Sequence, residues 1–128
     1  MAEKNPNLFS EALEKLLVLL NDANPDVQAW AADALGSLAN VIRKNKMHTR
    51  IVSKLIEMLE SPFPFTRICA TETLGKIGDP SALNPLKKLL DKETEEIVVF
   101  KREKWIKAKD IVKEAIENIK NKNRISNF

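Results

Sequence analysis

The chain has 128 residues, of which 44% are hydrophobic and 30% charged, and its formal net charge is +3. This composition predicts one folded domain with a sizeable core and excludes a disordered chain. The N-terminus has no signal-peptide pattern, and the longest apolar run, Leu16 to Leu20, is far too short to span a bilayer. The one cysteine cannot form an internal disulfide. We therefore expect a cytoplasmic protein without membrane contact.

Apolar residues recur at helical spacing between breaks rich in Pro, Asn and Gly, which predicts a series of amphipathic helices and no strand. Six helices are expected. The first, third and fifth cover 8–21, 49–60 and 81–91. The second begins after Asn24, the fourth begins after Pro64, and the sixth ends at Ile119. Asn24 is expected to be the N-cap of the second helix, with Pro25 at its first position.

Two helix templates alternate along the chain. The stripe that ends at Leu20 recurs in the stripe that ends at Leu59, a shift of 39 residues, and the segment 31–38 recurs at 70–77 with the same shift. A period of 30 to 40 residues is typical of a helical solenoid. We therefore predict an all-α fold, a right-handed α-α superhelix of three helix pairs over about 8–44, 47–78 and 80–121. These pairs form one domain over 1–122, followed by a flexible tail over 123–128.

The stretch from Thr66 to Asp91, with Leu74-Gly75-Lys76-Ile77-Gly78-Asp79-Pro80 at its centre, resembles the HEAT-repeat family, in particular the short repeats of the phycobilin-lyase-like type. The resemblance implies antiparallel helix pairs whose second members line the concave side of a short solenoid. It also implies a non-catalytic scaffold for protein interaction. The His-Glu pairs of the HEAT-repeat iron hydroxylases are absent.

The third pair is longer than the other two. Its equivalent positions, Leu90 and Ile116, are 26 residues apart, whereas Leu20 and Leu35 are 15 apart, so eleven residues are inserted near 94–104. A terminal repeat needs a cover for its apolar face, so we expect the insertion to cap the open end. The alternative is a projecting element that a partner grips.

No motif for catalysis, for a cofactor or for a metal is present, so we predict that the protein is not an enzyme and needs no cofactor. His48, the only histidine, is expected to have no partner, and Cys69 is expected to be a small buried residue. Gly36 and Gly75, which conflict with helix propensity, are expected where a neighbouring helix approaches closely.

On helical wheels, the second helices present small, apolar and acidic residues to the concave side. We expect a protein or peptide partner of basic character there, with contacts among Ala29, Trp30, Asp33, Arg67, Ile68, Glu72, Lys109 and Lys113. An exposed Ile68 predicts that Ile68→Asp abolishes binding without unfolding the chain.

The segment from Lys101 to Arg124 has nine basic and four acidic residues, a net charge of +5, whereas the rest of the chain sums to −2, which raises the alternative of a nucleic-acid partner. Its contacts are expected from Lys101, Arg102, Lys104, Trp105 and Lys107. Val18 and Leu19 fall off the main stripe of the first helix, so we expect either a monomer or a weak homodimer.

Overall fold

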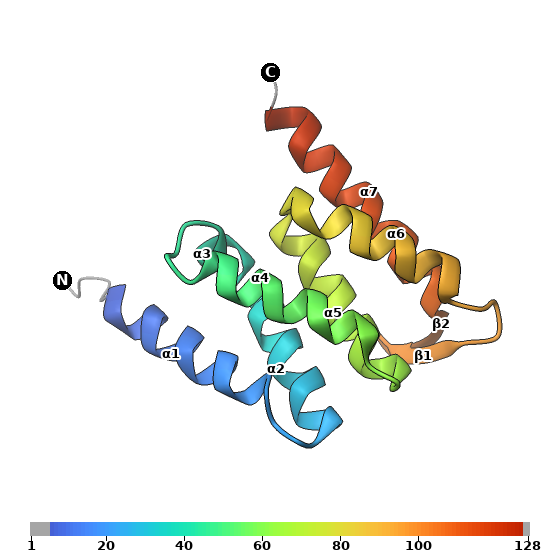
Figure 1. Cartoon of the computed structure of the whole chain (residues 1–128), viewed down its shortest axis with the longest axis horizontal. Helices are drawn as coiled ribbons and strands as arrows, with labels where there is room; N and C mark the ends of the chain where they lie inside the picture. The colour runs from blue at the N-terminus through green and yellow to red at the C-terminus, as the bar shows by residue number, and fades with distance from the viewer. Residues whose placement is uncertain (1–5, 127–128) are drawn as a thin grey trace.

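The computed structural model describes residues 6–126, and most of them are helical (Figure 1). The α-helices are α1 (Pro6–Leu19), α2 (Pro25–Ser37), α3 (Ala39–Arg43), α4 (His48–Glu57), α5 (Pro64–Ile77), α6 (Leu83–Lys92) and α7 (Ala108–Ser126). Two short 3₁₀ turns, η1 (Met58–Glu60) and η2 (Pro80–Ala82), and two strands, β1 (Val98–Lys101) and β2 (Lys104–Lys107), complete the chain.

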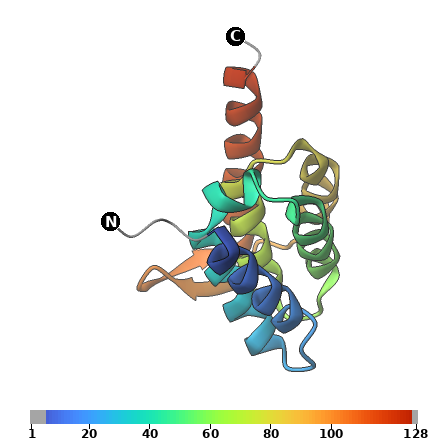
Figure 2. The same cartoon turned by 90° about the vertical axis from the view of Figure 1, so that its left-hand side faces the viewer.

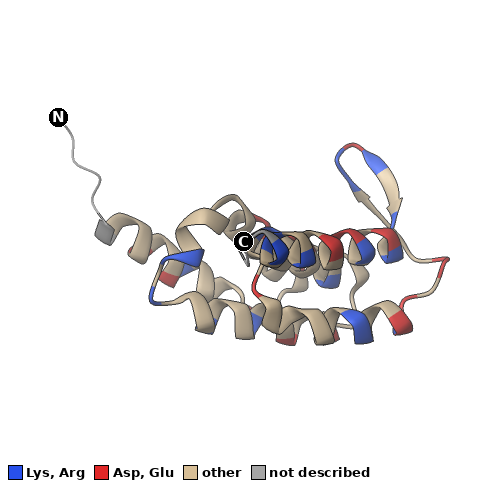
Figure 3. Cartoon of the chain, turned by 90° about the horizontal axis from the view of Figure 1, so that it is seen from above, with Lys and Arg blue, Asp and Glu red and all other residues tan. Residues whose placement is uncertain are grey.

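The helices form the expected solenoid of stacked pairs. The central helix α5 packs between α2 and α7, while α1, α4 and α6 pack on α2, α5 and α7 respectively. The strands form an antiparallel hairpin that lies on the other side of the α2, α5 and α7 layer from α4 and α6 (Figure 2). Viewed from above, this hairpin stands out from the helical layers (Figure 3).

Local sequence signals account for where the helices begin and end. The side chain of Asn24 accepts a hydrogen bond from the Asp26 amide at 2.8 Å, and Pro25 opens α2, as predicted. Pro64 opens α5 in the same way. That helix ends at Gly78, whose φ of 82° lies in the left-handed region that glycine adopts without strain.

The two helical glycines lie where the second helices come closest to one another. A Cβ atom on Gly36 would lie 2.9 Å from Oγ1 of Thr73, and one on Gly75 would lie 3.1 Å from Cα of Ala115. Thr73 also donates a hydrogen bond of 2.6 Å to the Ala32 carbonyl, which ties α5 to α2. The prediction of a close helix approach at both glycines is confirmed.

The helical-wheel assignment of Ile68 and Ala29 to an exposed face is wrong. Both residues are 0% exposed and belong to the hydrophobic core. The wheel treats each helix as though it had one covered face. The central helix α5, however, has α2 and α7 on its flanks, α4 on one side and β1 above it, so almost its whole circumference is buried.

The insertion forms a two-stranded hairpin, so the expectation of no strand is wrong. Val99 is 4% exposed, and Ile97 and Ile106 pack against the core, so one face of the hairpin caps the last repeat. The opposite face of the hairpin remains exposed. The insertion therefore does both things that the sequence offered as alternatives: one face caps the last repeat, and the hairpin projects from the solenoid.

The C-terminal helix is longer than expected. Residues 123–126, which the sequence assigned to a flexible tail, continue α7 as far as Ser126, and residues 127–128 lie outside the described part of the chain.

Burial reverses the expected effect of Ile68→Asp. A carboxylate placed in the core loses its hydration without a partner, so we expect the free energy of unfolding to fall by about 3 kcal/mol or more. Trp30→Asp is the control, because Trp30 is 63% exposed on the adjacent helix α2, and it should cost less than about 1 kcal/mol. Urea unfolding followed by circular dichroism measures both. Equal losses would contradict this assignment.

Candidate functional site

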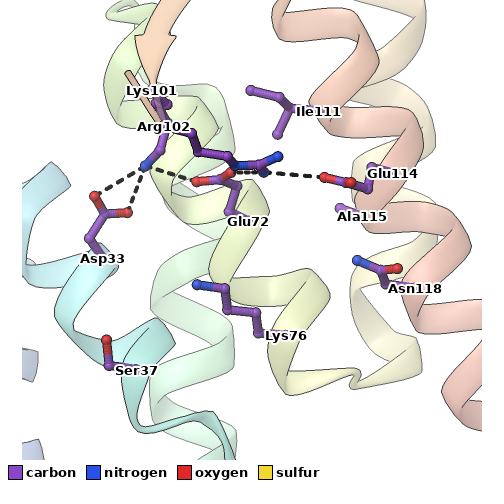
Figure 4. A pocket seen from close by; sticks show the side chains of 10 residues that line it. All are labelled: Asp33, Ser37, Glu72, Lys76, Lys101, Arg102, Ile111, Glu114, Ala115 and Asn118. Carbon is purple, nitrogen blue, oxygen red and sulfur yellow. Dashed lines mark hydrogen bonds and ion pairs between the residues drawn. The ribbon is translucent and has the colours of Figure 1, made fainter. Parts of the chain in front are cut away.

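Three carboxylates from three repeats line one groove on the hairpin side of the solenoid (Figure 4). Asp33 comes from α2, Glu72 from α5 and Glu114 from α7, and the groove between these helices has a volume of about 490 Å³. Asp33 and Glu72 are 39 residues apart and hold equivalent positions in their repeats. Stacking the repeats therefore turns a periodic acidic position into an acidic row.

The hairpin delivers a buried ammonium group to this row. Nζ of Lys101 lies 3.0 and 3.1 Å from the two Asp33 carboxylate oxygens and 2.8 Å from Oε1 of Glu72. It also lies 5.4 Å from the centroid of the Phe65 ring, within the range of a cation–π contact. Burial lowers the pKa of the Lys101 amine, but the hydrogen bonds and charges of Glu72 and Asp33 outweigh burial and hold that pKa above its ordinary value. Lys101 is therefore charged.

Arg102 extends the same network to the third repeat. Its guanidinium contacts Glu72 and donates a hydrogen bond of 3.3 Å to Glu114 (Figure 4). Burial raises the pKa of Glu72, but hydrogen bonds from Lys101 and Arg102 outweigh that effect, so the pKa of this carboxyl is below its ordinary value. Two cations of one turn thus link α2, α5 and α7.

The turn that presents these cations is conformationally unusual. Arg102 and Glu103 have φ values of 55° and 64°, and they connect the paired residues Lys101 and Lys104. Two positive φ values in a two-residue loop are the geometry of a type I′ turn, in which Asn-Gly is the common sequence. Without glycine, each residue carries roughly 1 kcal/mol or more of backbone strain. The ion pairs of Lys101 and Arg102 offset this strain.

The outward face of the hairpin is largely apolar, with one lysine, Lys107, opposite Val98. Phe100 and Trp105 are cross-strand partners whose rings meet edge to face with centroids 5.3 Å apart. Phe100 is 53% exposed, Trp105 is 69% exposed, and Val98 on the same face is also exposed. The ion pairs on one side of the hairpin therefore fix the position of an exposed aromatic pair on the other side.

The structure brings together some of the residues that the sequence assigned to partner binding. Asp33 and Glu72 line the groove, and Trp30 is exposed on α2. Arg67 instead makes a two-point ion pair with buried Glu93, at 2.9 and 3.0 Å, which ties α5 to the end of α6. Lys109 and Lys113 lie at the start of α7 and do not line the groove.

Of the five residues expected to contact nucleic acid, the structure leaves only some available for a partner. Lys101 is largely buried and Arg102 is paired with carboxylates, so neither is free to contact a phosphate. Lys107 lies 3.2 Å from Glu95 on the surface, whereas Lys104 and Trp105 are exposed.

The only histidine and the only cysteine of the chain, His48 and Cys69, each lie close to charged side chains. Nε2 of His48 lies 2.6 Å from Oδ2 of Asp79, so the expectation that His48 has no partner is wrong. The loop after α5 brings Asp79 to the start of α4, across 31 positions of sequence. Cys69 is buried, as predicted, and burial and the charge of Asp33 raise the pKa of its thiol to about 12.

Sequence reasoning missed the roles of Glu114, Phe100 and Val98. The contact of Glu114 with Arg102 depends on the hairpin, which the sequence did not reveal. The strand signal was present as two four-residue stretches, 98–101 and 104–107, separated by two residues. It was obscured because the turn lacks the glycine or asparagine that usually marks such a hairpin.

The repeat geometry agrees with the comparison to known families. A family model described as HEAT repeats matches residues 13–101, which is most of the chain. The chain belongs to the HEAT-repeat family. The match supports the family as a whole, and the resemblance to the phycobilin-lyase-like type stays a prediction. A search of curated proteins finds no match. The matched region of this HEAT-repeat protein ends with β1, so β2 and α7 lie beyond it.

Neither a metal site nor a membrane-spanning helix is found in the described part of the chain. Within residues 6–126, no group of three or more His, Cys, Asp or Glu side chains is placed to hold a metal ion. In the same part of the chain, no helix combines the length and apolarity needed to cross a bilayer.

The network predicts a specific effect of Lys101→Met. Removing the cation leaves Glu72 and Asp33 beside a largely buried apolar stem, so we expect the free energy of unfolding at neutral pH to fall by about 1–3 kcal/mol. Lys107→Met is the matched control, because Lys107 and Glu95 are both more than half exposed, and it should change stability by less than about 0.5 kcal/mol. Equal effects would contradict a special role for Lys101.

The same pair of variants gives a pH test. Because the folded-state pKa of Glu72 is lowered, its ion pairs stabilise the wild type above the ordinary carboxyl range, and this stabilisation is lost as the pH falls. The stability difference between wild type and Lys101→Met should therefore narrow in acid. Cys69 adds a second readout, since its sulfur lies 3.5 Å from Nζ of Lys101. Buried Cys69 is labelled by a thiol reagent only when the structure opens, so labelling should be slow in the wild type and faster in the less stable Lys101→Met.

Proposed function

We propose that this HEAT-repeat protein is a non-catalytic scaffold that binds a protein or peptide partner on the side of the solenoid that carries the hairpin. The observation that carries the proposal is the exposed Phe100–Trp105 pair on a hairpin fixed to all three repeats. Exposed aromatic residues held in one geometry lose little entropy on binding, and Trp is enriched among residues that dominate interface energy. HEAT repeats commonly mediate interactions between proteins, which supports the same conclusion.

The charges in the groove indicate which surface a partner contacts first. Asp33, Glu72 and Glu114 suit a basic ligand, but Lys101 and Arg102 of the same chain already neutralise much of this charge. A second basic segment would have to compete with the hairpin. The outward face of the hairpin, with Val98, Phe100 and Trp105, is therefore the primary contact, and the edge of the groove with Trp30 is secondary.

The proposal predicts a selective effect of Trp105→Ala. Tagged wild type, Trp105→Ala and the control Phe63→Ala are used to capture proteins from the native cell extract, with quantitative mass spectrometry. Phe63 is half exposed but lines a different pocket, with Pro25 and Lys54. Specific partners should be retained by wild type and Phe63→Ala and reduced at least about tenfold by Trp105→Ala. Identical partner sets for all three proteins would exclude the hairpin as the contact.

A nucleic-acid role is the second candidate, because exposed Lys107 lies on the same face of the hairpin as exposed Trp105. Aromatic stacking combined with cations is how single strands are bound without sequence preference. This candidate predicts binding of a labelled single-stranded oligonucleotide that weakens steeply with salt and is lost in Trp105→Ala. Fluorescence anisotropy measures it. Absence of binding at low salt would eliminate this role and leave the protein-binding proposal unaffected.

A further inference from the structure

The first helix exposes leucines on a side that faces away from the core. Leu13, Leu17 and Leu20 face the core, and α1 packs chiefly on α2. Leu8 is 62% exposed and Leu19 is 40% exposed, on a different side of the same helix. At the other end of the solenoid, the exposed positions of α7 between Asp110 and Arg124 are polar. The two ends of the solenoid therefore differ in polarity: α1 exposes leucines, whereas α7 exposes polar residues.

The exposed stripe has the spacing of a helix–helix seam. Leu8, Ala12, Lys15 and Leu19 follow one another at intervals of four, three and four residues, so they lie along one side of α1. Glu11 and Lys15 are exposed beside the small residue Ala12, near the middle of the stripe. The stripe thus has leucines at both ends, a small residue at its centre, and one acid and one base on its edge.

We propose that this stripe binds the same stripe of a second copy of the chain, with the two α1 helices antiparallel about a two-fold axis. In that arrangement Leu8 of one copy lies against Leu19 of the other, and Ala12 leaves room for the aliphatic stem of Lys15. The amine of Lys15 then reaches Glu11 of the second copy, and the symmetry forms this ion pair twice. A parallel pairing would place like charges opposite one another, so the charge pattern selects the antiparallel dimer.

This inference is independent of the proposed partner surface. α1 and the hairpin lie at opposite ends of the solenoid (Figure 1), so a dimer through α1 leaves Phe100 and Trp105 uncovered. The dimer would present two hairpins and raise the avidity for a partner that has two binding sites.

Neighbouring residues on α1 provide a matched test. Sedimentation velocity of the full chain should show a concentration-dependent dimer for the wild type. Leu19→Glu should raise the dimer Kd at least about tenfold, because a leucine leaves the interface and a charge enters it. Val18→Glu is the control, since Val18 is 69% exposed but lies about 100° around α1 from Leu19 and outside the stripe, so it should change the Kd much less. Circular dichroism checks that both variants remain folded.

Charge exchange tests the orientation of the two helices. Glu11→Lys and Lys15→Glu each place like charges across the two-fold axis, so each variant alone should dimerise more weakly than the wild type. When the two variants are mixed, both cross-axis contacts become opposite in charge, and a heterodimer of about wild-type strength should form. A wild type that stays monomeric at the highest concentrations, a dimer that tolerates Leu19→Glu, or a mixture no stronger than its components would each overturn the proposal.

Discussion

The close packing of α2, α5 and α7 is the constraint on which the other features depend. Gly36 and Gly75 allow these helices to approach until a Cβ atom would contact the neighbouring helix, and Thr73 adds a hydrogen bond to the α2 backbone. Because the repeats are stacked at this short spacing, Asp33, Glu72 and Glu114 are brought to one groove. The acidic row is thus a consequence of helix packing, although each acid is an ordinary polar residue in its own repeat.

Three adjacent carboxylates would repel one another, and the inserted hairpin relieves this repulsion. Lys101 and Arg102 neutralise the row, while the row in turn holds a turn that has positive φ at two residues other than glycine. Neither part is favourable alone, since the strained turn needs the ion pairs and the acids need the cations. Their combination fixes the hairpin across all three repeats and fixes the aromatic pair on its outward face.

The two apolar surfaces of the molecule differ in origin. The Phe100–Trp105 surface belongs to an insertion into the third repeat, which fits a specific role, while the α1 stripe belongs to the repeat pattern itself. Each helix of a solenoid is patterned to pack on its neighbours, and the exposed leucines of α1 have the spacing of such a helix contact. The proposed partner contact and the proposed dimer contact follow from this difference, and they lie on separate parts of the solenoid.

The sequence by itself determined the helices, the 39-residue repeat, the cap at Asn24, the packing role of the glycines, and the equivalent positions of Asp33 and Glu72 in successive repeats. These features depend on local periodicity and on residues that occupy the same place in each repeat. Tertiary structure alone decided that Ile68 and Ala29 are buried, because their burial comes from neighbouring helices that a wheel of one helix does not represent. It also decided the pairing of His48 with Asp79 and of Lys101 with Asp33, which are 31 and 68 residues apart. Tertiary structure also decided the hairpin. Its turn lacks the glycine or asparagine that usually marks a hairpin, and it is held by carboxylates on α2, α5 and α7.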